Sequence, residues 1–96
     1  MKEFILPGRT DCIRYHDLPG DGTPIVFIHG LGCASSMDYP NVAAQAPLAR
    51  HRRILVDLLG AGFSDKPDDF GYAAEDHAEY LLQFVETIGL NSFVLF

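Results

Sequence analysis

The sequence is poor in cysteine, in basic residues and in long apolar runs. Its two cysteines, Cys12 and Cys33, are too few for a disulfide framework and lack the C-x-x-C spacing of zinc or dithiol sites. We therefore expect reduced thiols and a cytoplasmic protein. Seven basic against thirteen acidic residues give a net charge of −6, which disfavours binding to nucleic acid or to an anionic membrane surface. No apolar run approaches the roughly 20 residues of a membrane span, and the apolar stretch near Met1 is too short for a signal peptide.

The composition is that of one small folded domain. Of the 96 residues, 48% are hydrophobic and 21% are charged, which supplies enough apolar side chains for a core. This balance argues against a disordered tail, a collagen-like rod or a low-complexity linker.

Five short segments predict β-strands. Residues 4–6 and 12–16 flank the turn residues 8–11, which predicts an antiparallel hairpin. The other three segments are continuous apolar runs, typical of strands covered on both faces; they are residues 24–28, 54–56 and 93–96.

Two segments between these strands have helical character. Residues 39–49 are rich in alanine and leucine, and Pro40 is tolerated in a first helical turn. In residues 74–88, apolar side chains recur every three or four positions and share one face of a helix. Gly89 follows at the position that glycine favours just past a helix end.

The predicted order is β-β-β-α-β-α-β. Alternating strands and helices indicate an α/β fold, with a mostly parallel sheet, a leading antiparallel hairpin and helices on both faces. Such folds place ligands at the carboxyl ends of their parallel strands, and a glycine cluster follows two of the predicted strands. His29-Gly30-Leu31-Gly32 follows the first, and Asp57 opens the second cluster, which contains Gly60, Gly62 and Ser64. Glycines let the backbone turn sharply and leave its N–H groups unshielded by side chains. Such N–H groups can donate hydrogen bonds to an oxyanion or a phosphate.

Dinucleotide binding is one interpretation of these clusters. Gly30-x-Gly32-x-x-Ser35 partly imitates the G-x-G-x-x-G fingerprint, and Asp57 stands where a ribose-binding acid would lie. Three features count against it: Ser35 replaces the third glycine, two strands precede the motif, and a loop over residues 35–38 separates the glycines from the next helix.

The two clusters together resemble motifs of the α/β-hydrolase superfamily. Residues 24–32, PIVFIHGLG, are similar to its third strand and H-G-x-G turn. Residues 57–67, DLLGAGFSDKP, are similar to its D-x-x-G-x-G-x-S loop after the fourth strand. The predicted element order also matches the first half of that fold. Leu59 is a small departure, because many members carry proline or arginine there.

The resemblance implies roles for individual residues. The backbone N–H of Leu31 would be one oxyanion-hole donor, with His29, Gly30 and Gly32 shaping its turn. Four residues would hold the second loop as structure and take no part in the reaction; they are Asp57, Gly60, Gly62 and Ser64. The implied activity is cofactor-independent hydrolysis of small esters, amides or related electrophiles, with a small-molecule substrate and no metal.

The residues that would complete this chemistry are missing from the sequence. The superfamily's nucleophile lies on a G-x-S-x-G elbow directly after the fifth strand, and its acid and catalytic histidine follow later. No G-x-S-x-G occurs in the 96 residues. We therefore expect residues 1–96 to be the N-terminal part of a single hydrolase domain, inactive in isolation.

Other reactive side chains have simpler structural interpretations. Ser64 and His29 could be combined with Asp57 or Asp65 into a triad, but serine commonly ties a turn and a buried histidine commonly positions its loop. Cys33 is expected to line a pocket, and His77 to pack on its helix.

Two further expectations remain open. Residues 93–96 would form a strand with one bare apolar edge, which invites self-association. A non-catalytic α/β module that binds ligands in the same cleft is the alternative function.

Overall fold

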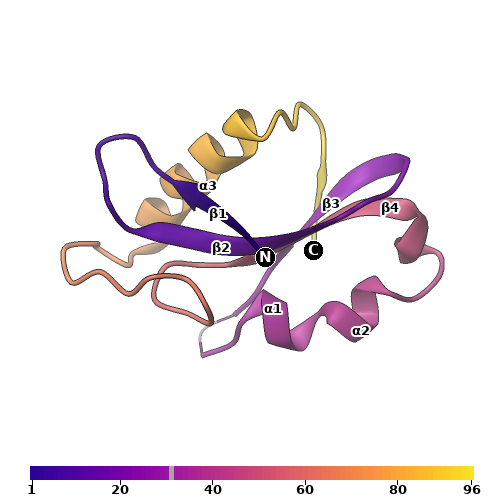
Figure 1. Cartoon of the computed structure of the whole chain (residues 1–96), viewed down its shortest axis with the longest axis horizontal. Coiled ribbons are helices and arrows are strands. Elements are labelled where there is room, and N and C mark those ends of the chain that lie inside the picture. The colour runs from indigo at the N-terminus through magenta and orange to yellow at the C-terminus, as the bar shows by residue number, and fades with distance from the viewer. Residues whose placement is uncertain (31) are drawn as a thin grey trace.

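The computed structural model describes residues 1–30 and 32–96. These residues form a mixed five-stranded sheet in the order β1-β2-β4-β3-β5 (Figure 1). The strands are β1 (Lys2–Ile5), β2 (Cys12–Leu18), β3 (Gly22–Ile28), β4 (His51–Asp57) and β5 (Val94–Leu95). β2 is antiparallel to β1 and β4, whereas β3 is parallel to β4 and β5. The predicted α/β class, the leading hairpin and the mixed sheet are confirmed.

Helices cover both faces of the sheet, as predicted. In Figure 1, α3 (Ala74–Thr87) lies above the sheet, and α1 (Ser35–Asp38) and α2 (Pro40–Ala43) lie below it. A short 3₁₀ turn, η1 (Leu48–Arg50), leads into β4. None of the helices in residues 1–30 and 32–96 has the length and apolar character that a membrane crossing requires.

The prediction of one helix over residues 39–49 is wrong. The segment holds α2 and η1, and α1 begins earlier, inside residues that were expected to form a loop. Two prolines explain the interruption. Pro40 occupies the first turn of α2, where its missing N–H costs nothing, whereas Pro47 lacks the N–H that a continuous helix would need. The peptide bond before Pro47 is cis.

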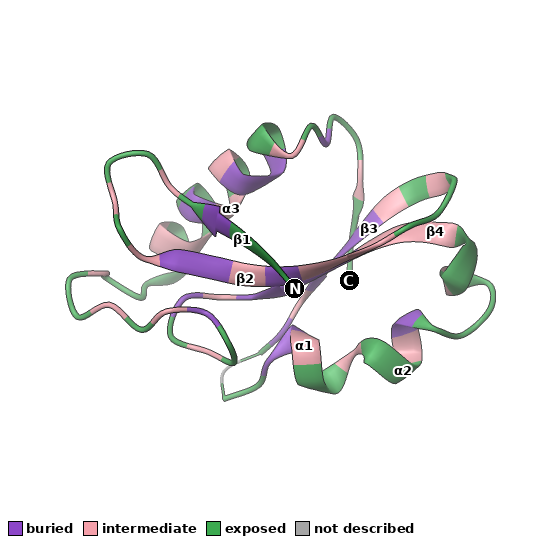
Figure 2. Cartoon of the chain, viewed as in Figure 1, coloured by how far each residue is buried: buried purple, intermediate pink, exposed green. Residues whose placement is uncertain are grey.

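Figure 2 shows buried residues along β2, β3 and α3. Because successive residues of a strand point to opposite faces, the buried apolar residues form two clusters. Val26, Ile54 and Val56 face α3, where they join Phe4, Ile13, Tyr15, Tyr80, Phe84 and Val85. Ile25, Phe27 and Leu55 face α2 together with Ala43. Each central strand is therefore covered on both sides, which explains why its sequence is a continuous apolar run.

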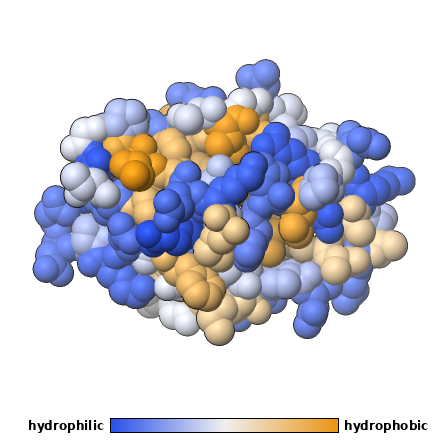
Figure 3. Space-filling view, in the orientation of Figure 1, coloured by the Kyte–Doolittle hydropathy of each residue, from blue (hydrophilic) through white to orange (hydrophobic). Residues whose placement is uncertain are grey.

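The longest helix begins and ends as its sequence predicts. Asp76 accepts a hydrogen bond from the backbone N–H of Ala73 at 3.1 Å, which satisfies one free donor of the first turn. At the other end, Gly89 has φ of +83°, and the N–H of Leu90 donates to the carbonyl of Val85 at 2.9 Å. This glycine cap turns the chain back toward β5. The face of the molecule seen in Figure 3 is mixed, with separate hydrophobic areas among hydrophilic ones.

Candidate functional site

Two loops meet at one end of the parallel strand pair. β3 ends at Ile28, β4 ends at Asp57, and Ile28 lies in register with Val56. The chain segments that follow them therefore emerge side by side, as expected for the carboxyl ends of parallel strands. They enclose a cleft of about 500 Å³, and the first turn of α3 forms another part of its wall. Its described lining consists of His29, Gly30, Gly32, Cys33, Leu58, Leu59, Gly60, Ala61, Gly62, Tyr72, Ala74 and His77.

His29 joins the two loops through both nitrogens of its ring. Nε2 accepts a hydrogen bond from the N–H of Leu58 at 3.0 Å, which leaves the ring proton on Nδ1. Nδ1 lies 2.9 Å from the carbonyl oxygen of Gly30 and is placed to donate to it. Because both nitrogens are engaged and the residue is only 8% exposed, His29 is not placed to act as a general base.

The turn after β3 presents bare backbone to the cleft. Gly32 has φ of +78°, a conformation that favours glycine, and the N–H of Cys33 donates to the carbonyl of Gly30 at 3.1 Å. A Cβ atom added at Gly30 or Gly32 would meet nothing within 4 Å, so the space beside both glycines is open. Leu31, the expected oxyanion-hole donor, lies outside the described residues.

Asp57 fastens this turn to the loop after β4. Its fully buried carboxylate accepts hydrogen bonds from the N–H and the hydroxyl of Ser36, at 2.9 and 2.6 Å, and from the N–H of Phe63 at 3.0 Å. Three donors on one ionisable group compensate for much of the cost of burying it. The same aspartate thus holds both loops that line the cleft.

The glycines of the second loop are required by this arrangement. Gly62 has φ of +51°, and a Cβ there would lie 2.2 Å from Oδ2 of Asp57. Gly60 has φ of +86°, and a Cβ there would lie 2.7 Å from Cε1 of Tyr72. A side chain at either position would push apart the groups that close the loop.

Ser64 is tied into the structure and is not available as a nucleophile. It is 2% exposed, its hydroxyl donates to the carbonyl of Asp57, and that hydroxyl accepts the N–H of Arg14 at 2.7 Å. The improvised triad of Ser64, His29 and either Asp57 or Asp65 is not assembled, because the hydrogen-bonding groups of Ser64 and His29 bind backbone.

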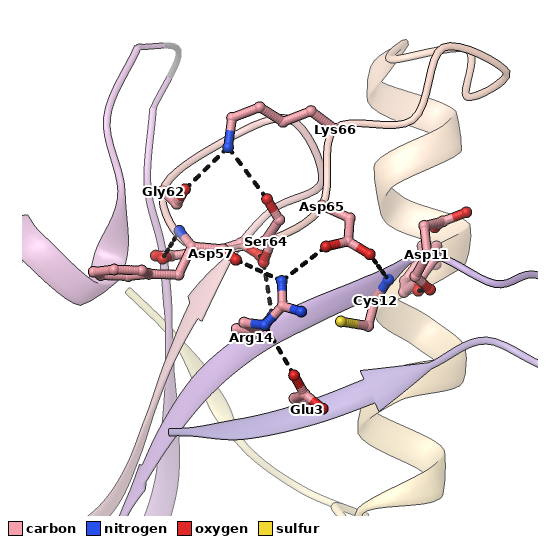
Figure 4. A network of polar contacts seen from close by, with 11 residues as sticks. Glu3, Asp11, Cys12, Arg14, Asp57, Gly62, Ser64, Asp65 and Lys66 are labelled. Carbon is pink, nitrogen blue, oxygen red and sulfur yellow. Dashed lines mark hydrogen bonds and ion pairs between the residues drawn. The ribbon is translucent and has the colours of Figure 1, made fainter.

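A polar network beside Ser64 connects the second loop to the hairpin (Figure 4). The Arg14 guanidinium donates to Asp65 at 2.8 Å, to Glu3 at 3.0 Å and to the carbonyl of Phe63 at 2.7 Å. Asp65 also accepts the N–H of Cys12 at 3.0 Å. The Arg14 hydrogen bond, assisted by this N–H, lowers the pKa of the Asp65 carboxyl below its ordinary value.

Tyr72 and His77 add aromatic side chains to the lining of the cleft. The ring of Phe70 meets Tyr72 and His77 edge-on, with centroids 4.9 and 5.1 Å apart. Tyr72 has φ of +60°, uncommon for a residue with a side chain, and its hydroxyl donates to the carbonyl of Pro67 at 2.6 Å. Burial lowers the pKa of the His77 imidazole below its ordinary value, which favours the neutral ring at neutral pH.

The two cysteines have different surroundings. Cys33 is exposed and lines the cleft, whereas Cys12 is buried in β2. Burial raises the pKa of the Cys12 thiol and so disfavours its reactive thiolate. Within residues 1–30 and 32–96, no three histidine, cysteine or acidic side chains come together as a metal site would require.

Sequence reasoning missed three residues of the site. Ser36 was expected in a plain loop, and no sequence signal links it to Asp57, which lies 21 positions further along the chain. Arg14 contacts residues 49 to 51 positions further along the chain, and no sequence pattern predicts contacts between residues so far apart. Tyr72 lies in the irregular segment before α3, and its left-handed backbone has no sequence signal.

The described residues can bind and orient a ligand, and they offer backbone groups to it. Among them we find no nucleophile paired with a free base. The helix after the glycine turn, α1, has four residues, so it does not supply the long helix that holds a pyrophosphate in dinucleotide-binding folds.

Comparison with known proteins adds independent information. Residues 23–96 match the profile of the α/β hydrolase fold family. Haloalkane dehalogenase 2 of Mycobacterium tuberculosis is 34% identical over 82 residues, covering 85% of this chain and 28% of that protein. The 2-hydroxy-6-oxo-2,4-heptadienoate hydrolase of Pseudomonas putida is 32% identical over 84 residues, covering 79% of this chain and 28% of that protein. The chain thus spans less than a third of the length of these curated relatives.

Solved structures agree in fold. A haloalkane dehalogenase loop variant from Bradyrhizobium elkanii superposes with a TM-score of 0.80 at 28% identity, covering 98% of this chain and 30% of that one. A meta-cleavage product hydrolase from Pseudomonas fluorescens reaches 0.82 at 23% identity, covering 99% of this chain and 34% of that one. The second likeness concerns the fold alone.

Proposed function

Because this chain belongs to the α/β-hydrolase fold family, we propose that it is the N-terminal part of a cofactor-independent hydrolase. Residues 1–96 would form the N-terminal part of a single α/β-hydrolase domain. The coverage of relatives supports this proposal, since almost the whole chain superposes on about a third of the Bradyrhizobium and Pseudomonas fluorescens structures. The nucleophile, its acid and its histidine would belong to other polypeptide of the same domain.

One observation carries the proposal. Two glycine turns at the carboxyl ends of adjacent parallel strands are fastened together by His29 and Asp57, and both line one cleft. In this interpretation the Leu31 N–H stabilises the oxyanion that forms when the nucleophile attacks. One such donor is worth roughly 3–4 kcal/mol of the activation barrier. His29, Gly30 and Gly32 would position that donor without reacting.

The lining of the cleft supports an uncharged substrate. Its described residues include no aspartate, glutamate, lysine or arginine, and burial favours the neutral form of His77. A charged group placed there would lose its hydration without gaining a partner. Small esters, amides and related neutral electrophiles fit such a surface.

Kinetics on a matched set of proteins tests this function. The 96-residue chain should not turn over a p-nitrophenyl ester, whereas the longer polypeptide encoded by the same gene should. In that longer protein, Leu31→Pro removes the N–H and should lower kcat by about 10²–10³-fold. Leu31→Ala keeps the N–H, serves as the control and should leave kcat within a few-fold. Circular dichroism of each variant shows whether it has folded.

Two results would contradict the proposal. Turnover by the highly purified 96-residue chain, abolished by Ser64→Ala, would place the nucleophile inside these residues. A longer polypeptide that binds small neutral ligands in the cleft without turnover would instead support the alternative, a non-catalytic binding module. That alternative is compatible with the described cleft, which has no free nucleophile and base among its residues.

A further inference from the structure

The cleft is large compared with the chemical group that would react in it. Its volume of about 500 Å³ lies in the range of sites that hold whole small-molecule ligands. The proposed oxyanion donor would contact a single oxygen atom of the substrate, so most of the cleft surrounds other parts of that molecule. The side chains beside those parts therefore decide which substrates fit.

Few side chains of the cleft can hydrogen-bond to a ligand. In the described lining, nitrogen or oxygen atoms occur in the side chains of His29, Tyr72 and His77. Both ring nitrogens of His29 are engaged with backbone, and Tyr72 spends its one hydroxyl proton on the carbonyl of Pro67. Within residues 1–30 and 32–96, neither ring nitrogen of His77 has a hydrogen-bond partner. In that part of the chain, His77 thus supplies the uncommitted side-chain N–H of the cleft.

The ring nitrogens of His77 are accessible as well as unpartnered. Among the described residues, Oδ2 of Asp11 is the one side-chain nitrogen or oxygen atom that is both buried and without a partner. The nitrogens of His77 therefore keep some accessible surface, although the residue is half-buried in the lining of the cleft. A ligand can hydrogen-bond to the ring without displacing a protein group.

Aromatic neighbours hold the imidazole in one place. Its ring centroid lies 5.1 Å from that of Phe70 and 6.0 Å from that of Tyr72, edge-on to both. Its backbone belongs to the helix α3, where the His77 N–H donates to the carbonyl of Ala73 at 3.2 Å. A donor that is already fixed loses little side-chain entropy when a ligand binds to it.

We propose that His77 determines substrate specificity by donating a hydrogen bond from its imidazole to an acceptor oxygen remote from the reacting carbonyl. This inference rests on the proposed function, because it takes the cleft as the place where the substrate binds. The other described side chains of the lining, among them Leu58, Leu59 and Ala61, are apolar or already engaged. The substrate is thus a small, neutral and largely apolar ester or amide that carries a second oxygen, such as a ketone.

Kinetics of the longer polypeptide with matched esters tests this role. Phenyl hexanoate has no remote acceptor, phenyl 5-oxohexanoate carries one in the acyl chain, and 4-acetylphenyl hexanoate carries one in the leaving group. His77→Phe keeps an aromatic ring without its N–H, and it should lower kcat/KM about 3–10-fold for at least one of the two ketone esters. The loss should lie in KM, because the bond is made in the ground state and in the transition state alike.

Two further variants serve as controls for these kinetics. His77→Gln restores an N–H donor and should recover part of the loss. His16→Phe makes the same substitution outside the lining of the cleft and should leave every kcat/KM unchanged. Phenyl hexanoate should be hydrolysed at similar rates by all of these proteins. Equal losses for all three esters in His77→Phe would overturn the proposal, because they would show a purely structural role.

Binding to the 96-residue chain gives a second readout that does not depend on turnover. Cyclohexanone should shift the imidazole nitrogen NMR signals of His77 and leave those of His16 in place. Methylcyclohexane, which has no oxygen atom, should produce no such shift. Cyclohexanone that binds the His77→Phe chain as tightly as the unchanged chain would overturn the proposal. A longer polypeptide without esterase activity, in which cyclohexanone still shifts His77, would contradict the proposed hydrolase and leave His77 as a ligand-binding residue.

Discussion

The carboxylate of Asp57 accepts two hydrogen bonds from Ser36, one from its backbone N–H and one from its hydroxyl. The two residues are 21 positions apart, and each stands next to one of the two loops that line the cleft, Ser36 in α1 and Asp57 at the end of β4. This contact fixes the start of α1 against the end of β4. The position of the glycine turn between them therefore depends on a buried charge.

Removing the Ser36 hydroxyl should destabilise the fold. In Ser36→Ala, the Asp57 carboxylate loses a charge-assisted hydrogen bond in a buried place, so the free energy of unfolding should fall by about 1.5–3 kcal/mol. Urea denaturation measures this loss. Ser92→Ala, on an exposed serine, is the control and should stay within about 0.5 kcal/mol of the starting protein. Equal stabilities of the two variants would contradict the role of Asp57.

Alanine substitutions at two left-handed glycines distinguish the stability cost of backbone strain from that of steric collision. Gly8 has φ of +88° with open space around it, so Gly8→Ala should cost about 1–2 kcal/mol from backbone strain alone. Gly62 is also left-handed, but its added Cβ would collide with Asp57. Gly62→Ala should therefore cost about 1–3 kcal/mol more than Gly8→Ala, as overpacking does. Thermal unfolding of both variants compares them directly, and a smaller cost at Gly62 would show that the loop relaxes freely.

The two cysteines should react at different rates. Cys33 lines the cleft and is exposed, so a thiol reagent should label it rapidly in the folded protein. Cys12 is buried with a raised pKa, so its labelling should wait for unfolding. Mass spectrometry of the peptides distinguishes the sites, with Cys33→Ser as the control. A small neutral ligand that occupies the cleft should slow the labelling of Cys33.

The Asp17–Arg52 pair should contribute to acid sensitivity. Arg52 donates two hydrogen bonds to Asp17, at 3.0 and 2.8 Å, and these lower the pKa of the Asp17 carboxyl. A lowered folded pKa stabilises the protein above the unfolded value of about 3.9, and that stability is lost as pH falls through the folded value. Asp17→Asn should flatten this part of the stability curve.

The pKa of His77 should lie below that of an ordinary histidine. Burial lowers its folded pKa, so the unfolded chain binds its proton first as pH falls below about 6.5. Stability from this residue is therefore present at neutral pH and declines as pH falls through the unfolded value toward the folded one. NMR titration of the imidazole measures the pKa, and His77→Phe should remove this pH dependence. A pKa at or above 6.5 would contradict the burial seen here.

The local features of the fold can be predicted from the sequence alone. Continuous apolar runs mark β3 and β4, the three-to-four spacing marks α3, and Gly89 marks its end. These features depend on neighbouring residues, so propensity and periodicity are enough to predict them. The two glycine clusters also identified the loops that line the cleft, because their positions after parallel strands follow from the element order.

Only the tertiary structure decided which distant groups meet. It placed β4 between β2 and β3, joined Ser36 to Asp57, brought Arg14 to Asp65 and divided residues 39–49 into shorter pieces. Such contacts depend on strand register and on the packing of whole elements, which no short stretch of residues specifies. The sequence alone showed which residue types lie at the cleft. Only the folded structure showed that the side chains of His29 and Ser64 are hydrogen-bonded to backbone groups.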